Sequence, residues 1–192
     1  MAKRPRLKKR QLQAIIGLIV MLAVYICQQQ GWFGNFLEQD QPGMYRITRY
    51  VDGDTIVVNM NGSDETIRFI GIDTPETHKP NTPVQCYGPA AAAHTKNLLQ
   101  ANGGKVRLAA DPLGTNRDRY NRLLRYVYTP DGQLVNEVNI REGYAFYYPY
   151  FPFTKSQQFA AAQSQAQSTS KGLWGNCQPI RTDKGGYTMP SA

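Results

Sequence analysis

Histidine and cysteine are scarce in this sequence of 192 residues, which contains two histidines and three cysteines. A zinc site needs clustered Cys and His ligands at short spacing, and the sequence has no such cluster. Repeats at solenoid or propeller spacing, coiled-coil heptads and collagen-like triplets are also absent. Because 41% of the residues are hydrophobic, the chain is too apolar to be disordered. These features predict one globular domain that depends neither on zinc nor on repetition.

The sequence also lacks an apolar run as long as the hydrocarbon core of a membrane is thick. The uncharged stretch Ala14–Cys27 follows a basic N-terminus and would form a helix of ~21 Å, whereas the hydrocarbon core of a bilayer is ~30 Å thick. No small-residue cleavage site follows it, which favours a signal anchor over the alternative of a cleaved signal peptide. Either way, residues 1–11 are a basic cytoplasmic tail and residues 12–27 the membrane-directed helix. The remainder is expected outside the cytoplasm, anchored at the cell membrane or secreted.

Acidic residues are fewer than basic ones, with 14 Asp and Glu against 22 Lys and Arg. Six of the basic residues lie within the first ten positions, so residues 11–192 carry 16 basic and 14 acidic side chains. Most of the net charge of +8 therefore belongs to the tail, where it sets membrane topology. Any affinity of the remainder for a polyanion must come from a few local contacts.

The chain that follows a linker at residues 28–43 has the pattern of a small β-rich domain. Apolar and polar residues alternate in the first strand, and Asn61-Gly62 is a strong hairpin signal between the next two. Strands are expected at residues 44–51, 54–60, 65–72, 105–110 and 122–129, and helices at residues 89–100, 136–142 and 155–168. This order predicts an α+β fold: a five-stranded OB-type β-barrel with one inserted helix and C-terminal helices, preceded by an N-terminal hydrophobic helix.

An even pair of cysteines, Cys86 and Cys177, lies in the part of the chain expected outside the cytoplasm. An oxidising compartment favours a disulfide between them, with two free thiols as the alternative. The domain is therefore expected to cover residues 44–178, followed by a flexible C-terminal tail at residues 179–192.

Carboxylate side chains gather around the ends of the first strands. Asp52-Gly53-Asp54 stands where the first strand turns into the second, which by itself is an ordinary turn signal. Asp73 and Glu76 follow the third strand at the start of a long loop, and long ordered loops often carry function. If the strands bring these four carboxylates together, a cation must offset their repulsion. Oxygen ligands without a His or Cys set favour Ca²⁺ over zinc.

Arginine is the second kind of side chain in the candidate site. Arg68 lies inside the otherwise apolar third strand, and four more arginines occur within nine positions around the start of the fifth strand. These four are Arg117, Arg119, Arg122 and Arg125. The planar guanidinium fork matches phosphate oxygens, although such a loop can also be a solvated surface. A metal, a carboxylate that positions water and guanidinium groups are together what phosphodiester hydrolysis needs.

Several segments resemble the staphylococcal nuclease (thermonuclease) family, in the family's order. They are Asp-Gly-Asp-Thr at 52–55, Ile-Arg-Phe-Ile-Gly-Ile-Asp-Thr-Pro-Glu at 67–76, Cys-Tyr-Gly-Pro-Ala-Ala at 86–91, Asp-Arg-Tyr-Asn-Arg-Leu-Leu-Arg-Tyr-Val at 118–127, Val-Asn-Glu at 135–137 and Gly-Leu-Trp at 172–174. The resemblance covers about residues 45–174. It implies a Ca²⁺-dependent nuclease that hydrolyses DNA and RNA with little sequence specificity and leaves 3′-phosphate ends. It implies no protein partner, so a monomer is expected.

The resemblance also implies roles for individual residues of the carboxylate cluster. Asp54 and Asp73 would bind Ca²⁺ through their side chains, and Thr74 would bind it through its backbone carbonyl. Asp52 would lie behind these ligands. Glu76 would position or deprotonate the attacking water.

Arg68 and Arg122 match the two arginines that hold the scissile phosphate in the family. Arg119 and Tyr120 match positions that contact a terminal nucleotide phosphate. The family usually has glycine where this chain has Asn121. Asn tolerates positive φ better than other non-glycine residues, so the tight turn and the activity are expected to be retained.

The family's base-stacking aromatic residues have several matches in the run at residues 144–150, of which Tyr148 and Tyr150 are preferred. Packing against the barrel is the alternative for both. The alternative function for the whole domain is that of a catalytically silent OB-type binding module, which would lack some of the catalytic or metal-binding residues. The sequence keeps all five of these residues, namely Asp54, Arg68, Asp73, Glu76 and Arg122. Hydrolysis is therefore the predicted activity.

Overall fold

The computed structural model describes residues 13, 17–18, 21–22, 43–77 and 83–190. The chain divides into two units, Met1–Glu38 and Gln39–Ala192, and the described residues of the first unit are helical. The predicted cytoplasmic tail, most of the membrane-directed helix and all but the last residue of the predicted linker lie outside the described residues. Among the described residues, no helix is long and apolar enough to cross a membrane.

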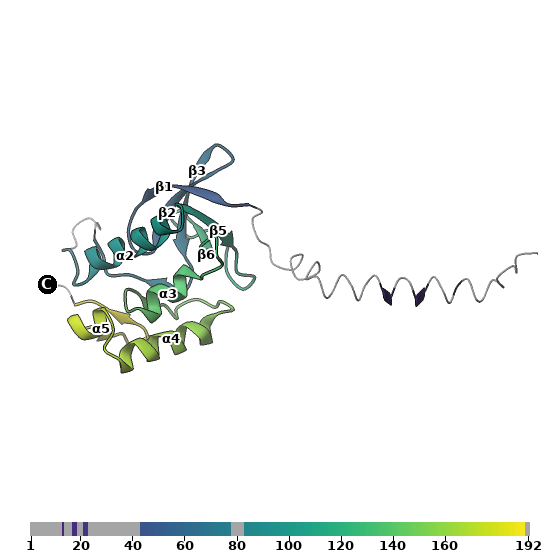
Figure 1. Ribbon diagram of the computed structural model, residues 1–192. Coiled ribbons are helices and arrows are strands. Elements are labelled where there is room, and N and C mark those ends of the chain that lie inside the picture. Colours follow the sequence, from purple (N-terminus) through teal and green to yellow (C-terminus); the bar gives the residue numbers. More distant parts are fainter. Residues whose placement is uncertain (1–12, 14–16, 19–20, 23–42, 78–82, 191–192) are drawn as a thin grey trace, which may run out of the picture. The chain divides into compact units, whose positions relative to one another are not determined.

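A closed five-stranded barrel forms the centre of the second unit (Figure 1). Its strands are β1 (Tyr45–Tyr50), β2 (Thr55–Met60), β3 (Ser63–Phe69), β5 (Lys105–Ala109) and β6 (Leu123–Tyr128). They follow the order β1-β2-β3-β6-β5 and close through the pairing of β5 with β1. β3 and β6 are parallel, and the other neighbours are antiparallel. The predicted OB-type barrel is confirmed.

The β2–β3 hairpin forms around the predicted Asn61-Gly62 turn. Both turn residues have positive φ, 54° and 93°, a backbone region that Asn and Gly adopt more readily than other residues. The register pairs Thr55 with Arg68 at the far end of the hairpin. Arg68 is therefore held directly beside the residue that follows Asp54.

Four helices complete the described part of the second unit. They are α2 (Gly88–Ala101), α3 (Val135–Arg141), α4 (Ser156–Ser168) and α5 (Leu173–Asn176). Pro89 occupies the first turn of α2, where its missing N–H costs no hydrogen bond. α3 lies between the barrel and α4 and contacts both (Figure 1). The core is continuous across these layers, because Ile67 and Val127 of the barrel share one buried cluster with Phe159 of α4.

Asn136 of α3 is fully buried and links β6 to the residue that follows β3. Its Nδ2 donates to the carbonyl of Ile70 (2.9 Å), and its Oδ1 accepts from the N–H of Val127 (2.9 Å). A buried backbone group without a partner would cost about 1–3 kcal/mol. Asn136 therefore allows the chain to leave β3 after Phe69 and turn toward the carboxylate cluster.

A two-stranded sheet beside the barrel does not follow from the sequence pattern. β4 (Ile72–Asp73) pairs antiparallel with β7 (Phe146–Tyr147). Strands of two residues are too short to show an alternation of apolar and polar residues. The third strand expected from the sequence accordingly divides into β3 and β4.

The C-terminal segment differs from the expectation of a flexible tail at residues 179–192. β8 (Ile180–Arg181) and β9 (Tyr187–Thr188) form an antiparallel hairpin. Met189 is 4% exposed and packs in a small hydrophobic cluster with Phe146. Burial of apolar surface against the domain therefore holds this segment in place.

Cys86 and Cys177 form a disulfide, as predicted. It links the segment just before α2 to the residue after α5 and closes a loop with a sequence separation of 91. In the chain-entropy model, a link across so long a loop stabilises a fold by about 4–5 kcal/mol.

Asp111, which follows β5, ties the barrel to the segment that leads into α4. Its side chain accepts hydrogen bonds from Tyr126 Oη (2.6 Å), the Thr154 N–H (2.7 Å) and the Leu113 N–H (2.8 Å). Burial raises the pKa of Asp111, but these hydrogen bonds outweigh it, so the pKa lies below its ordinary value.

Replacement of Asp111 by Asn is expected to lower the free energy of unfolding by about 1.5–3 kcal/mol at neutral pH, because hydrogen bonds to a charged acceptor are lost. Since folding lowers the pKa of Asp111, its stabilisation is complete above about pH 4 and is lost as the pH falls through the folded-state pKa. Urea unfolding of both proteins at neutral and at acidic pH measures the difference. An equal cost of Asp111→Asn at both pH values would contradict this assignment.

Candidate active site

The turn between β1 and β2 is held by two helices. The Asp54 N–H donates to Asp52 Oδ1 (3.0 Å), which closes the turn. The Gly53 carbonyl accepts from Thr95 Oγ1 of α2 (2.8 Å) and from Asn139 Nδ2 of α3 (3.2 Å). The position of the Asp54 side chain is therefore fixed by the barrel together with α2 and α3.

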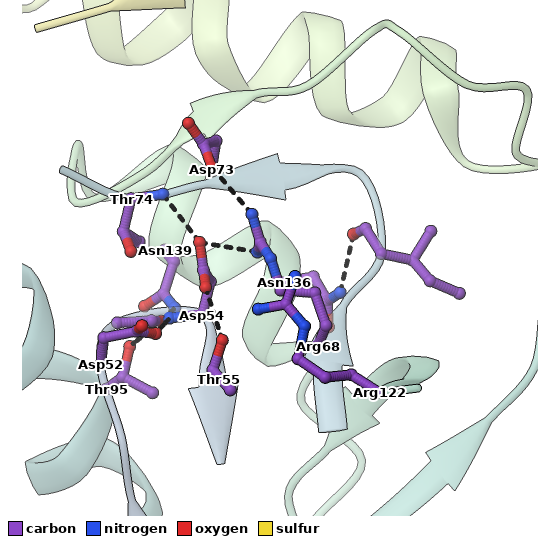
Figure 2. Close-up of polar contacts among 12 residues, drawn as sticks. Asp52, Asp54, Thr55, Arg68, Asp73, Thr74, Thr95, Arg122, Asn136 and Asn139 are labelled. Carbon is purple, nitrogen blue, oxygen red and sulfur yellow. Dashed lines mark hydrogen bonds and ion pairs between the residues drawn. The ribbon is translucent and has the colours of Figure 1, made fainter. Parts of the chain in front are cut away.

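Asp54 is buried, and both of its carboxylate oxygens are engaged (Figure 2). One oxygen accepts from Thr55 Oγ1 (2.9 Å). The other accepts from the Thr74 N–H (2.9 Å) and lies 2.6 Å from Arg68 Nη1. Thr74 approaches so closely that a Cβ atom on Gly53 would lie 2.8 Å from its Cγ2. Asp54 thus joins β2, β3 and the residue after β4 at one point.

Arg68 lies between two carboxylates (Figure 2). Its Nη1 contacts Asp54, and its Nη2 donates to Asp73 Oδ1 (2.8 Å). Burial lowers the pKa of Arg68, but the charges of Asp54 and Asp73 raise it above its ordinary value, so the guanidinium stays charged. Asp54 is buried whereas Asp73 is half-buried, so the cluster faces solvent on the Asp73 side.

Two carboxyl groups of this cluster have pKa values well above the ordinary value. Burial raises the pKa of Asp52 to about 7, and the charge of Asp54 adds to the rise. The pKa of Asp73 is also raised to about 7, because burial outweighs the attraction of Arg68 and the charges of Asp54 and Glu76 act in the same direction. Burial and the neighbouring carboxylates together therefore outweigh the attraction of the single guanidinium, that of Arg68.

Within residues 43–77 and 83–190, no group of three or more His, Cys, Asp or Glu side chains could hold a metal ion. The predicted ligand set is not a group of three such side chains. It consists of two carboxylates, Asp54 and Asp73, and one backbone carbonyl, that of Thr74. The structure brings these three residues together. Their donors are all oxygen atoms, and the surplus of negative charge around them suits a hard divalent cation, not zinc. The residues present therefore fit a hard divalent cation such as Ca²⁺.

Glu76 lies three residues after Asp73, and its backbone is held by Gln85. The Glu76 N–H donates to Gln85 Oε1 (2.8 Å), and the Glu76 carbonyl accepts from the Gln85 N–H (2.9 Å). The charge of Glu76 raises the pKa of Asp73, so the two carboxyl groups lie within electrostatic reach of each other. The predicted water-positioning residue is thus at the edge of the carboxylate cluster.

Arg122 directly precedes β6 and continues the face of the barrel that carries Arg68 (Figure 2). The parallel β3–β6 register pairs Arg68 with Leu124, and side chains two positions apart on a strand point to the same face. Asp118 Oδ2 lies 2.7 Å from both Nε and Nη2 of Arg122. This two-point contact fixes the direction of the Arg122 guanidinium.

Tyr120 is an exposed aromatic ring between two guanidinium groups. Its ring centroid lies 4.7 Å from Arg119 Cζ and 5.4 Å from Arg122 Cζ. Arg119 Nη2 donates to Tyr120 Oη (2.7 Å). Asn121, next in the chain, has a φ of 64°, which is the positive value predicted for the residue that replaces the family's glycine. An accessible ring flanked by positive charge suits a nucleotide.

Two of the four arginines predicted to form a phosphate clamp have structural roles instead. Arg117 makes a two-point ion pair with Glu65 (2.9 and 3.0 Å). Arg125 is 2% exposed and donates to Asn116 Oδ1 (2.8 Å). The prediction that all four arginines bind phosphate is therefore wrong for Arg117 and Arg125. Alternation along β6 puts Arg125 on the buried face with Val127, away from any bound phosphate.

The β4–β7 pairing brings Tyr148 toward the carboxylates. Burial raises the pKa of Tyr148, the charge of Asp73 raises it further, and the charge of Arg68 lowers it, so the phenol lies near both groups. The ring of Tyr150 meets that of Tyr148 edge-on, with 4.6 Å between centroids. Tyr150 Oη also shares a hydrogen bond with Thr182 Oγ1 of the C-terminal hairpin. Of the two predicted stacking residues, Tyr148 borders the carboxylate cluster, and Tyr150 packs against the ring of Tyr148.

Four residues that position the site are absent from the sequence-based set, namely Gln85, Thr95, Asp118 and Asn139. Asn139 is fully buried and donates to Thr95 Oγ1 (2.8 Å) as well as to the turn. The sequence could have indicated a role for Asn139, because it lies three positions after Asn136 on a short helix. Two asparagines on the same buried helix face need hydrogen-bond partners. Gln85 and Asp118 give no such signal, since polar residues are common in loops.

Residues 66–176 match the family described as "Staphylococcal nuclease homologue", over more than half of the chain. The chain belongs to the staphylococcal nuclease family. The match includes Arg68, Asp73, Glu76 and Arg122, whereas Asp54 precedes it and is joined to the set by its contacts with Arg68 and Thr74.

Individual relatives of the family are similar over most of this chain. The protein named "Thermonuclease" from Staphylococcus hyicus is 38% identical over 166 residues, which are 84% of this chain and 94% of that protein. The "Thermonuclease" of Staphylococcus intermedius is 36% identical over 160 residues, 83% of this chain and 92% of that protein. The "SPbeta prophage-derived endonuclease YokF" of Bacillus subtilis (strain 168) is 45% identical over 141 residues, 72% of this chain. This chain spans 46% of YokF.

Proposed function

We propose that the protein is a Ca²⁺-dependent nuclease that hydrolyses phosphodiester bonds of DNA and RNA with little sequence specificity. The observation that carries the proposal is the Arg68 guanidinium between Asp54 and Asp73, on the face that Arg122 shares. Acidic oxygens and guanidinium groups at one solvent-facing point suit phosphoryl chemistry. The names of the thermonuclease and endonuclease relatives support the same activity.

Glu76 is the base of the proposed reaction. It accepts a proton from a water molecule whose oxygen forms a bond to phosphorus. The bond between phosphorus and the 5′ oxygen breaks, and that oxygen leaves with a proton from solvent. A 3′-phosphate and a 5′-hydroxyl remain, as the family resemblance implies.

Arg68 and Arg122 are the proposed phosphate-binding groups. Both Nη atoms of Arg68 contact carboxylates, and because a guanidinium has five N–H donors, further donors remain for a phosphate oxygen. Arg122 is already aimed by Asp118. Guanidinium groups oriented in advance stabilise the charge that develops on phosphate oxygens without a reorganisation cost during the reaction.

Asp54, Asp73 and the carbonyl of Thr74 are the proposed ligands of Ca²⁺, with Asp52 behind Asp54. When bound, the ion would polarise a phosphate oxygen and neutralise carboxylate charge. Two features support this assignment: the oxygen-only donor set and the pKa values near 7 of Asp52 and Asp73. Burial of the two carboxyl groups is the main cause of these raised pKa values, and the charges of neighbouring carboxylates add to it.

Three aromatic residues and one arginine are proposed to contact the nucleotides around the scissile phosphate. Tyr120 with Arg119 forms an exposed stacking surface, and Tyr148, supported by Tyr150, borders the carboxylates. Stacking on an aromatic ring contributes about 1–3 kcal/mol per base and tolerates any sequence. Contacts of this kind agree with low sequence specificity.

Cleavage by the 192-residue protein is expected to require Ca²⁺. Removal of the ion with EGTA should lower the rate on DNA and on RNA by at least about 100-fold, because several kcal/mol of charge stabilisation are lost. Restored Ca²⁺ should return the activity, and the products should accept a polymerase only after a phosphatase removes the 3′-phosphate. Undiminished cleavage in EGTA would contradict the metal requirement, and 3′-hydroxyl ends would contradict the proposed bond cleavage.

The site of action is proposed to be outside the cytoplasm, with the protein a monomer that is either anchored by residues 12–27 or released. The Cys86–Cys177 disulfide supports this location, because such bonds persist in oxidising compartments. Protease added to intact cells should digest an anchored domain, and a released one should occur in the medium. A domain that stays protected in intact cells and absent from the medium would contradict the proposal.

A further inference from the structure

We propose that Gln85 and the Cys86–Cys177 disulfide position Glu76 for catalysis, so that the C-terminal end of the domain controls turnover at the active site. This inference rests on the proposed role of Glu76. It adds two positioning elements that do not themselves touch the substrate.

The first element is the two-point contact between Glu76 and Gln85. The side-chain Oε1 of Gln85 accepts from the Glu76 N–H (2.8 Å), and the backbone N–H of Gln85 donates to the Glu76 carbonyl (2.9 Å). A Cβ atom on Gly88 would lie 2.7 Å from the same carbonyl, so glycine at this position is what allows the approach. Both backbone polar groups of Glu76 are thus held by one neighbouring residue.

The second element is the covalent link at the next residue. Cys86 follows Gln85 directly and is bonded to Cys177 at the end of α5. That end is rigid, because Leu173 is fully buried and its N–H donates to the carbonyl of Gly143 (2.8 Å). The Gln85-Cys86 segment precedes α2 and belongs to no helix or strand. The disulfide therefore gives this segment a covalent attachment to the packed C-terminal part of the domain.

Position matters more for Glu76 than for the phosphate-binding groups. A base must lie within hydrogen-bonding reach of the attacking water, and a misplacement of about 1 Å can cost about 100-fold in rate. Arg68 and Arg122 depend instead on β3, β6 and Asp118. Loss of the Gln85 contact or of the disulfide should therefore lower kcat and leave KM nearly unchanged.

The test measures steady-state kinetics of DNA cleavage by the full chain in Ca²⁺. Gln85→Leu and the double variant Cys86→Ser/Cys177→Ser should each lower kcat by about 10–100-fold, with KM changed by less than about threefold. Gln85→Glu keeps an acceptor oxygen and should retain more activity than Gln85→Leu. Gln100→Leu, the same substitution at the exposed far end of α2, is the matched control and should behave as wild type.

A double-mutant cycle with Glu76→Gln separates positioning from a general loss of structure. In the Glu76→Gln background, Gln85→Leu should cause no further fall in kcat, because the group that Gln85 positions is already removed. Equal losses in both backgrounds, or an unchanged kcat in Gln85→Leu, would overturn the inference. The cycle is run below the melting temperature of each variant, and Gln85→Leu keeps the disulfide, so the result does not depend on the folding of the cysteine variant.

The same cycle distinguishes failure of this inference from failure of the proposed function. If Glu76→Gln alone keeps full activity, Glu76 is not the base, and both the mechanism and this inference fail. If Glu76→Gln loses activity while Gln85→Leu and the cysteine variant keep it, the mechanism stands and the positioning role is refuted. Wild type treated with dithiothreitol should match the cysteine variant, which dithiothreitol should not affect.

Discussion

Substitution of Glu76 by Gln is expected to lower kcat for DNA hydrolysis by about 100- to 10,000-fold, the contribution that a positioned general base usually makes. Gln has nearly the same shape as Glu but cannot accept the proton of the attacking water. The Glu76 backbone contacts with Gln85 do not involve the carboxylate, so the fold should persist. KM should change little, because the phosphate-binding arginines are untouched.

The measurement is single-turnover cleavage of an end-labelled DNA oligonucleotide in saturating Ca²⁺. Glu137→Gln is a suitable control, because Glu137 is a carboxylate on α3 that bonds only to the side chain of Gln158 among the described contacts. The control should cleave at the wild-type rate. A Glu76→Gln protein that cleaves as fast as the control would show that another group activates the water.

Substitution of Arg68 by Ala should reduce both activity and stability. Removal of one preorganised donor to a developing charge costs about 100- to 1,000-fold in kcat. Asp54 and Asp73 would also lose their shared cationic partner, and breaking a buried ion pair commonly costs about 3–5 kcal/mol of folding free energy. Since Asp73 is half-buried, the lower end of that range is expected.

Kinetics and urea unfolding in EGTA and in Ca²⁺ separate these two effects. Ca²⁺ should recover part of the lost stability, because it supplies the missing positive charge, but should not recover the activity. Arg46→Ala is the matched control, since Arg46 is exposed on β1 and pairs in register with Asn59 at the opposite end of β2 from Asp54, and it should keep the wild-type kcat. Full activity in Arg68→Ala, or an equal loss in Arg46→Ala, would contradict the assigned roles.

The barrel could be predicted because its signals are local. Alternation marks β1, and Asn61-Gly62 supplies the positive φ values of the β2–β3 turn. The contact of Asp54 with Arg68 follows from the same local signals, because the hairpin register pairs Thr55 with Arg68. Asp73 reaches Arg68 from β4, which pairs with the distant β7.

The parts that could not be predicted depend on contacts between distant segments. The buried position of Arg125 is set by the β3–β6 register and by Asn116, neither of which is visible in a run of arginines. The β8–β9 hairpin owes its place to burial of Met189 in a cluster with Phe146. The contact between Gln85 and Glu76 joins residues nine positions apart, and no periodic pattern of the sequence predicts it.

The most direct test of the account is the Ca²⁺ dependence of single-turnover DNA cleavage in wild type and in Asp73→Asn. Asp73 is proposed both to bind Ca²⁺ and to pair with Arg68, and Asn keeps the shape of the side chain while removing its charge. We expect the half-saturating Ca²⁺ concentration to rise at least about tenfold in Asp73→Asn, because one charged ligand is lost. Identical Ca²⁺ curves for the two proteins would contradict the claim that this cluster holds the ion used in hydrolysis.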